Sequence, residues 1–339
     1  MCLVMIALFI REPERGAAER RKGEIVAEMV NTSYCDDIKA LLSNLTYVFS
    51  TIAYTAIVFV VGTLTWWGPT ACEHSEAHIA GLNSTDLLGP EEKAKINLTF
   101  GIITCIGGIV GVSLGSGLSM LLRTGWGPFK CVKTIRSDPI ICGFGALIGI
   151  PALYFAIQSI ETNMTVCYAL IFVTVTTLCF NWATNVDMIM AVVAPTRRSA
   201  ANSWQILLSH LLGDASGPYV IGLISDAIRG EDSTPYGRFK SLAKSFYLPN
   251  VLQLVSAVVF FVAAYTYVRD HNRFKESMGK AFIGIGFAIE NNNEVRTGVL
   301  KPIYTKSLQG DVTAAAGKVN QGFSAIEREE RKVVENWSC

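Results

Sequence analysis

The sequence predicts an all-α membrane protein with six transmembrane helices between Lys39 and Arg269. Two observations lead to this fold class. Hydrophobic residues make up 50% of the chain and charged residues only 17%, whereas an ordinary soluble domain has about 25% charged residues. Six long segments are also nearly free of charge, and about 20 apolar residues span the hydrocarbon as a helix. In lipid each such segment must satisfy its own backbone polar groups, which favours helices over isolated strands.

The six segments are separated by short polar loops. They are Ala40–Cys72, Ile96–Leu122, Pro139–Ile160, Thr162–Val193, a stretch from just after Arg198 to about Ser225, and Ser245–Val268. Each is long enough to cross a bilayer. The fourth contains Asp187 and the fifth contains His210 and Asp214, whereas the other four carry no charged residue.

The remaining regions are assigned by length and composition. Residues 1–10 are apolar but too few to cross a bilayer, and they lack the basic start and cleavage site of a signal peptide. We therefore expect them to be the end of a truncated transmembrane helix. Residues 11–39 are expected to form a cytoplasmic linker and residues 40–268 the six-helix unit. Residues 269–339 are polar and poor in aromatic residues, which favours a cytoplasmic, mostly disordered tail.

The loops predict the orientation of the chain. Lysine and arginine are more frequent at 11–39, 123–136 and 197–198 than at 73–95, 161–165 and 226–244. The first set, and with it the tail after Arg269, is therefore expected in the cytoplasm. Glycosylation sequons at Asn83, Asn97 and Asn163 fall in the outward set. Asn83 is the expected acceptor because the other two lie close to the membrane. Sequons at the opposite side are expected to stay bare, at Asn31, Asn44 and Asn336.

The fifth segment holds the residues that point most strongly to function. His210 follows Arg198 by twelve residues, which is about 18 Å along a helix and near the middle of a hydrocarbon core of about 30 Å. A spacing of four places His210 and Asp214 on one face. The pair is either an internal hydrogen bond that fixes helix packing or a contact for a substrate headgroup or a proton. The functional interpretation is favoured, because ionisable residues at this depth are seldom kept without a use. Histidine favours proton linkage, since it titrates near neutral pH.

Polar residues also interrupt the fourth segment. Asn181 and Asn185 are expected to face a cavity or a neighbouring helix. Asp187 lies near the cytoplasmic end, where pairing with Arg197 or Arg198 would form a cytoplasmic gate. A pair that only neutralises buried charge fits the same spacing, so the sequence leaves both interpretations open.

No enzyme constellation is present. There is no HExxH motif and no GxSxG motif, and the nine cysteines show neither CxxC nor zinc spacing. The glycines at 107, 111 and 115 indicate close helix packing, since no Lys-Ser/Thr follows them as a phosphate loop would require. We expect no catalytic activity, no metal, no cofactor and no binding of nucleic acid.

At these residues the sequence resembles a known family. The stretch Ala194–Asp226 closely resembles the eleventh-helix block of spinster transporters, which belong to the major facilitator superfamily. Asn181-Trp182-Ala183 resembles the family's tenth-helix motif, and Glu12–Gly16 resembles the segment after its sixth helix. One departure is Ser216-Gly217, where family members commonly read Gly-Ser.

The resemblance implies a twelve-helix fold of two six-helix halves that move a lipid by alternating access. The six spans would form the C-terminal half, and residues 1–10 the end of the sixth helix. Candidate residues for substrate contact or proton coupling are His210, Asp214, Asn181, Trp182, Asn185 and Gln205. The substrate would be a lysolipid or sphingolipid, such as sphingosine-1-phosphate, carried with proton linkage in a lysosomal, late endosomal or plasma membrane.

Two other functions remain open. The chain could be a non-transporting half that partners or inhibits a full-length relative, and composition does not separate this from the transporter. A seven-span receptor is less favoured, because residues 1–10 are too short for a seventh helix and its usual cytosolic motifs are absent. The partners expected are a lipid substrate, the membrane, and a missing N-terminal half or a full-length relative.

Overall fold

A computed structural model describes residues 33–296 of the chain, and the described residues contain helices and connections but no strand. Contacts divide the chain into two units that meet between residues 281 and 282. The first unit contains every candidate membrane span, and the second is described only over residues 282–296, which are helical. The predicted helix end at 1–10 and most of the predicted linker at 11–39 lie outside the described residues.

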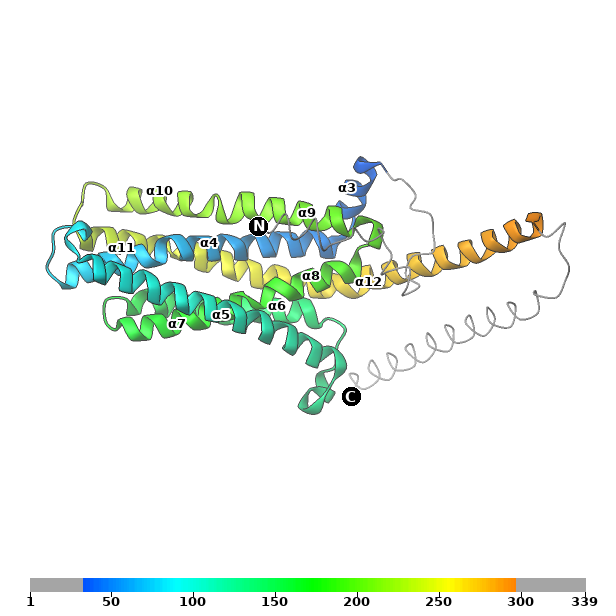
Figure 1. The fold of residues 1–339 in the computed structure, drawn as a ribbon, viewed down its shortest axis with the longest axis horizontal. Helices are drawn as coiled ribbons and strands as arrows, with labels where there is room; N and C mark the ends of the chain where they lie inside the picture. The colour runs from blue at the N-terminus through cyan, green and yellow to red at the C-terminus, as the bar shows by residue number, and fades with distance from the viewer. Residues whose placement is uncertain (1–32, 297–339) are drawn as a thin grey trace, which may run out of the picture. The chain divides into compact units, whose positions relative to one another are not determined.

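Each predicted span corresponds to one helix or to a short series of helices (Figure 1). The first four contain α4 (Leu45–Ile79), α5 (Pro90–Thr124), α6 (Ser137–Ser159), and the pair α7 (Met164–Leu178) and α8 (Phe180–Val192). The fifth contains η3 (Pro195–Arg197), α9 (Arg198–Ser209), the π-helical turn η4 (His210–Asp214) and α10 (Gly217–Arg229). The sixth corresponds to the first part of α12 (Tyr247–Arg296), which α11 (Pro235–Ser245) precedes. Shorter elements are α3 (Tyr34–Leu42), η1 (Thr85–Leu87) and η2 (Gly127–Val132).

In the described residues six helical segments are long and apolar enough to cross a membrane. Their number and order confirm the prediction from hydropathy. Their limits differ by several residues because caps, rather than apolar content, end a helix. Asn44, for example, starts α4 five residues after the apolar segment begins, since its side chain accepts a hydrogen bond from the Tyr47 N–H.

Helix α11 is the main element that the hydropathy pattern misses. It occupies a stretch predicted to be an outward loop, because lysines and an arginine interrupt any apolar window. Its apolar side chains nevertheless share one face, where Phe239 and Leu242 are buried. Thr234 caps the helix by accepting a hydrogen bond from the Gly237 N–H.

Two helices extend into the regions predicted to be a cytoplasmic linker and a tail. Helix α3 occupies part of the expected linker, and α12 continues to Arg296, well beyond the expected end at Val268. Of the expected disordered tail, residues 269–296 are described and continue α12. The disorder of the tail therefore stays a prediction.

Helix α4 is the central element of the first unit, since it packs against α9, η4, α10 and α11 (Figure 1). Helix α5 packs on α7 and α8 through the glycines noted in the sequence. A Cβ atom on Gly111 would lie 2.3 Å from the Thr176 carbonyl oxygen, and one on Gly115 would lie 2.6 Å from the Phe180 Cα atom. These glycines therefore serve close backbone approach, as the sequence indicates.

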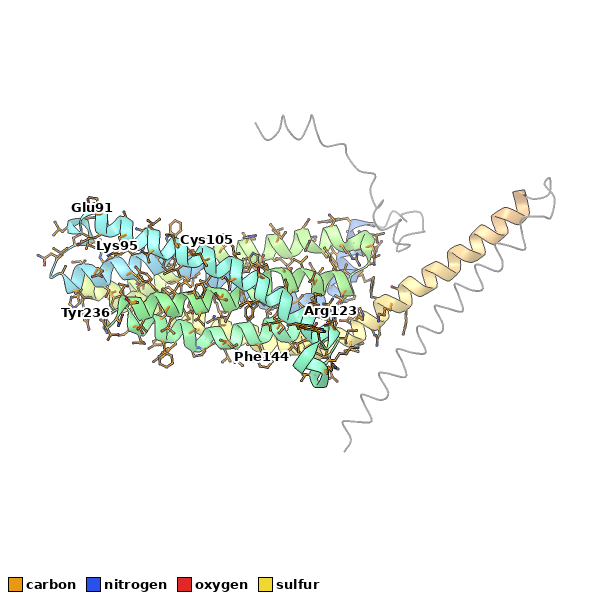
Figure 2. The ribbon with its side chains drawn as sticks, turned by 60° about the horizontal axis from the view of Figure 1, so that its bottom comes forward. Glu91, Lys95, Cys105, Arg123, Phe144 and Tyr236 are labelled. Atoms are coloured by element: carbon orange, nitrogen blue, oxygen red, sulfur yellow. The ribbon has the colours of Figure 1, made fainter. Side chains whose placement is uncertain are left out.

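The two ends of the bundle are marked by charged residues on α5 (Figure 2). Glu91 and Lys95 lie near the start of the helix, Cys105 lies along its length, and Arg123 lies at the opposite end. Because the sequence places Arg123 in the cytoplasmic set of loops, the Arg123 end is the end expected to face the cytoplasm.

Candidate functional site

The π-helical turn η4 brings His210 and Asp214 together. The His210 Nδ1 atom lies 2.8 Å from the Asp214 Oδ2 atom, and the direction of this hydrogen bond depends on the histidine tautomer. The two side chains are 59% and 40% exposed. The pair therefore lies on a face of the bundle that the described helices leave uncovered.

The backbone of η4 is held by close packing on α4. The Ala215 N–H donates to the His210 carbonyl at 3.0 Å, the five-residue span of a π-turn, and such turns are frequent at functional sites. A Cβ atom on Gly213 would lie 2.9 Å from Val58 Cγ1, and one on Gly62 would lie 2.5 Å from the Asp214 Cα atom. The inner side of the turn is thus fixed, while its two polar side chains remain exposed.

An apolar hollow of about 280 Å³ lies beside the same part of α4, between α4, α5, α7 and α8. Leu64 of α4, Thr104 of α5 and Trp182 of α8 are among its lining residues. Trp182 packs edge-on against Tyr54, with ring centroids 5.7 Å apart. Tyr54 therefore supports the tryptophan that lines the hollow, a position that the sequence did not indicate.

The other predicted polar residues form a buried chain. The Asn185 Nδ2 atom donates to the Gln205 Oε1 atom at 2.7 Å, and the Gln205 Nε2 atom donates to the Thr51 hydroxyl at 3.2 Å. Asn181 donates to the Leu178 carbonyl, at the break between α7 and α8. Asn181, Asn185 and Gln205 are at most 2% exposed. The hydrogen bonds from Asn185 to Gln205 and from Gln205 to Thr51 join α8, α9 and α4 inside the bundle. None of these side chains meets the His210–Asp214 pair at the surface of the bundle.

The residues of the predicted cytoplasmic gate have separate surroundings. Arg197 donates through Nε to the Asp37 carboxylate of α3 at 2.7 Å. Arg198 donates to the carbonyls of Met190 and Val193. Within the described residues Asp187 forms no ion pair with either arginine, so the proposed pairing is not made in this conformation.

An ion pair between a half-exposed arginine and a buried carboxylate, which the sequence did not indicate, lies at the same end of the bundle. The Asp138 carboxylate of α6 is fully buried and accepts hydrogen bonds from the Ser119 hydroxyl and the Arg123 guanidinium of α5. The available signal was one acidic residue directly before the third apolar segment. An acidic residue at this position is usually a charge exposed at the membrane surface. Here Asp138 is buried because Ser119 and Arg123 of α5 pack against it.

The outward sequons differ in accessibility. Asn83 is exposed in the connection after α4. Asn163 uses its side chain to cap α7, accepting from the N–H groups of Thr165 and Val166. Asn97 donates to Glu73 and to the Lys93 carbonyl. Glycosylation at Asn83 stays a prediction. Among the described residues no group of three or more His, Cys, Asp or Glu side chains could hold a metal ion.

The sequence is similar to proteins from several animals, although no profile of a known protein family matches it. Protein spinster homolog 1 of Rattus norvegicus is 35% identical over 274 residues, which cover 80% of this chain and 50% of that protein. Protein spinster homolog 1 of Homo sapiens is 38% identical over 229 residues, 68% of this chain and 41% of that protein. Protein spinster of Drosophila melanogaster is 39% identical over 227 residues, 66% of this chain and 34% of that protein. The chain thus spans half or less of the length of these relatives.

The fold is similar to that of a solved structure described as a bacterial homolog to the human lysosomal transporter spinster, in an inward-facing and unoccupied conformation. The TM-score is 0.55 at 16% identity, over 79% of this chain and 57% of that chain. The match confirms the predicted fold class, with six membrane-spanning helices arranged as half of a major facilitator fold. Assignment to the C-terminal half stays a prediction from the motifs. Together these similarities show that the chain is an integral, multi-pass membrane protein that belongs to the spinster family.

Proposed function

We propose that the described helices form one half of a lipid transporter, and that η4 and the apolar hollow form its contribution to the substrate site. The observation that carries this proposal is the exposed His210–Asp214 pair halfway along a membrane span. A charge at this depth costs about 2.5–3.5 kcal/mol on insertion scales if it faces lipid. A face that bears such a pair is therefore expected to border a water-filled cavity or another protein surface.

The chemistry of the two neighbouring surfaces suits a lysolipid or a sphingolipid. Lysophospholipids and sphingosine-1-phosphate combine a polar or charged headgroup with one long apolar chain. The imidazole of His210, oriented by Asp214, offers a hydrogen bond or a positive charge to a headgroup. The hollow beside Trp182 and Leu64 offers an apolar surface to the chain. Tyr54 packs edge-on against Trp182 at this hollow and adds an aromatic ring to the apolar surface.

Transport further requires a second half. In major facilitator folds the substrate lies near the bilayer midplane between the two six-helix halves, which rock about it. The uncovered face of α9, η4 and α10 fits this arrangement, because a second half would cover it. The same face also fits a half that pairs with a full-length relative and does not transport. We expect no lipid flux from the described six helices alone, and flux once both halves are present.

Transport by proteoliposomes that contain both halves, under an imposed pH gradient, tests the proposal. We expect His210→Ala to lower lysophospholipid or sphingosine-1-phosphate transport by at least about tenfold, or about 1.4 kcal/mol, and to flatten its pH profile. Asp214→Asn should weaken transport, because the carboxylate that orients the His210 imidazole through its Nδ1 atom is gone. Ser216→Ala, on the same helix, is the matched control and should change little.

The results for these variants distinguish a role of the His210–Asp214 pair in transport from a role in helix packing. If His210→Ala lowers yield or thermal stability and leaves the shape of the pH profile unchanged, the pair is structural and the proposal fails. If the wild-type preparation with both halves moves neither lipid, the non-transporting half becomes the better interpretation.

The orientation of the site in the membrane has its own test. We expect Asn83 to carry the glycan, because it is an exposed sequon on the side that has fewer basic residues. Asn83→Gln should remove most of the glycosidase-sensitive mobility shift on a gel. Asn44→Gln is the control, because the Asn44 amide donates to the Val192 carbonyl at the opposite end of α4. A shift that survives Asn83→Gln and disappears with Asn31→Gln would invert the topology.

A further inference from the structure

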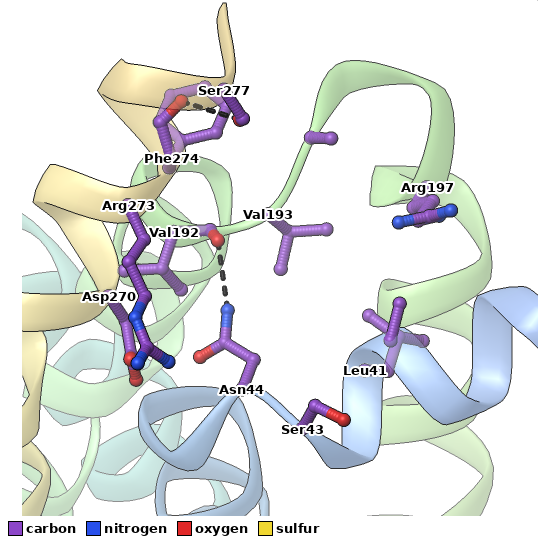
Figure 3. Close-up of a pocket in the computed structure, with 12 residues that line it drawn as sticks. Leu41, Ser43, Asn44, Val192, Val193, Arg197, Asp270, Arg273, Phe274 and Ser277 are labelled. Atoms are coloured by element: carbon purple, nitrogen blue, oxygen red, sulfur yellow. Dashed lines mark hydrogen bonds between the residues drawn. The ribbon is translucent and has the colours of Figure 1, made fainter.

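A second pocket opens at the end of the bundle that the basic loops place in the cytoplasm (Figure 3). We call it the rim pocket. It lies between α3, the start of α4, the α8–η3 connection and α12, and its volume is about 220 Å³. The rim pocket can therefore hold a hydrated phosphate group but not a whole lipid.

Two arginines supply the charge of the rim pocket. Arg197 comes from η3 and Arg273 from α12, and Figure 3 shows them on opposite sides of Val193. Arg197 uses its Nε atom for the contact with Asp37, and a guanidinium has five N–H donors. Arg273 is exposed and makes no hydrogen bond or ion pair with another described residue. The pocket thus presents cationic donors that its own described partners do not saturate.

The acidic residue in the lining, Asp270, is already matched by other groups. Its Oδ2 atom accepts hydrogen bonds from the Thr46 N–H at 2.9 Å and the Thr46 hydroxyl at 2.8 Å. Its Oδ1 atom accepts one from Arg269 at 3.0 Å. Asp270 is 4% exposed and caps the start of α4. Its charge is therefore compensated inside the bundle and opposes an anion at the two arginines only weakly.

The position of the rim pocket matches the headgroup layer of the membrane. Helix α4 begins beside it and α8 ends beside it, so it lies where the spans leave the hydrocarbon. Val192, Val193 and Phe274 make part of its lining apolar. The Arg198 guanidinium lies over the Phe274 ring at 5.9 Å and adds positive charge at the border. A ligand here would meet cations and hydrocarbon together.

We propose that the rim pocket binds the phosphate of an anionic phospholipid of the cytoplasmic leaflet, held between Arg197 and Arg273. The planar guanidinium forms paired hydrogen bonds with phosphate oxygens, and basic pockets between helices on the cytoplasmic side suit phosphorylated headgroups. The bound lipid would tie α3 and η3 to α12 through one anion. This site is distinct from η4 and does not depend on which molecule the chain transports.

The test measures binding of short-chain phosphatidylinositol 4-phosphate to the full chain in phosphatidylcholine nanodiscs, with a fluorescent label on the lipid. We expect Arg273→Gln and Arg197→Gln each to weaken binding roughly tenfold, the effect of one lost charged hydrogen bond. Arg136→Gln is the matched control. It removes an exposed positive charge from the same side of the membrane and should leave the affinity within about twofold.

Arg273→Gln decides the outcome if Arg197→Gln disturbs the fold, because Arg273 has no described partner to lose. Three results would overturn the proposal. The first is an equal loss with Arg136→Gln, which would indicate diffuse surface charge. The second is full displacement by inorganic phosphate at the same concentration as the lipid, which would indicate a soluble anion. The third is no saturable binding by the wild-type chain, which would indicate that the site is closed to lipid.

Discussion

All four of α4, α5, α6 and the α9–α10 series are long enough to cross a membrane. The first and third of these, α4 and α6, are much more buried in the bundle than α5 and the α9–α10 series. In the apolar windows of α4 and α6, 56% of residues are buried, against 22% in the windows of α5 and of α9–α10. Mean hydropathy does not follow this division, because it is 1.9 for α4 and 2.0 for α5. Hydropathy therefore places a helix in the membrane but does not tell which of its faces meets protein.

The two poorly buried regions also differ from each other. The open side of α5 is apolar, with Leu98, Ile106 and Ile109 exposed, and can face lipid without penalty. The α9–α10 series has the lowest mean hydropathy of the six, 1.2, and exposes His210 and Asp214. Only this second surface needs water or another protein beside it. Exposure alone is thus weak evidence of a functional face, and exposure of charge at mid-span is stronger.

The largest effect is expected where α5 is buried. Gly111→Ala would place a Cβ atom 2.3 Å from the Thr176 carbonyl oxygen, and we expect a loss of about 2–3 kcal/mol from overpacking. Gly117→Ala, on the open side where nothing lies within 4 Å, should be neutral or stabilising by up to about 1 kcal/mol. Thermal unfolding of both variants measures the difference. Equal effects would mean that the two faces of α5 are not distinct.

A smaller effect is expected inside the bundle between α8, α9 and α4. Gln205→Leu removes the partner of the Asn185 amide and the contact with Thr51. A buried donor left unsatisfied costs about 1–3 kcal/mol, so the midpoint of thermal unfolding should fall. Gln158→Leu, at an exposed position of α6, is the control and should change stability little. If Gln205→Leu is neutral, the polar chain does not hold the three helices together.

The smallest effect on stability is expected at η4. Exposed ion pairs contribute about 0–1 kcal/mol, so His210→Ala should leave the unfolding midpoint of the chain nearly unchanged. Such a result, together with the loss of transport expected above, would assign the exposed region to function and the buried region to folding. A stability loss as large as that of Gly111→Ala would remove this distinction.

The sequence alone determined the number, order and approximate limits of the six spans. It did so because a charge-free segment of about 20 residues has no stable place outside a membrane or a large core. It also placed His210 and Asp214 on one face of one helix, since a spacing of four is a local property of helices. The close packing of Gly111 and Gly115 was likewise indicated by their regular spacing.

Only the tertiary structure decided which residues far apart in the sequence meet. It paired Asp138 with Arg123, Arg197 with Asp37 and Gln205 with Asn185, and it placed Arg197 and Arg273 in one pocket. It also showed that α11 is a helix within a predicted loop. Burial of one apolar face stabilises this helix although the mean hydropathy of its sequence is low. The physical reason is common to these cases. Hydropathy and periodicity are sums over neighbours in sequence, whereas ion pairs, buried amides and pockets depend on how separate helices pack.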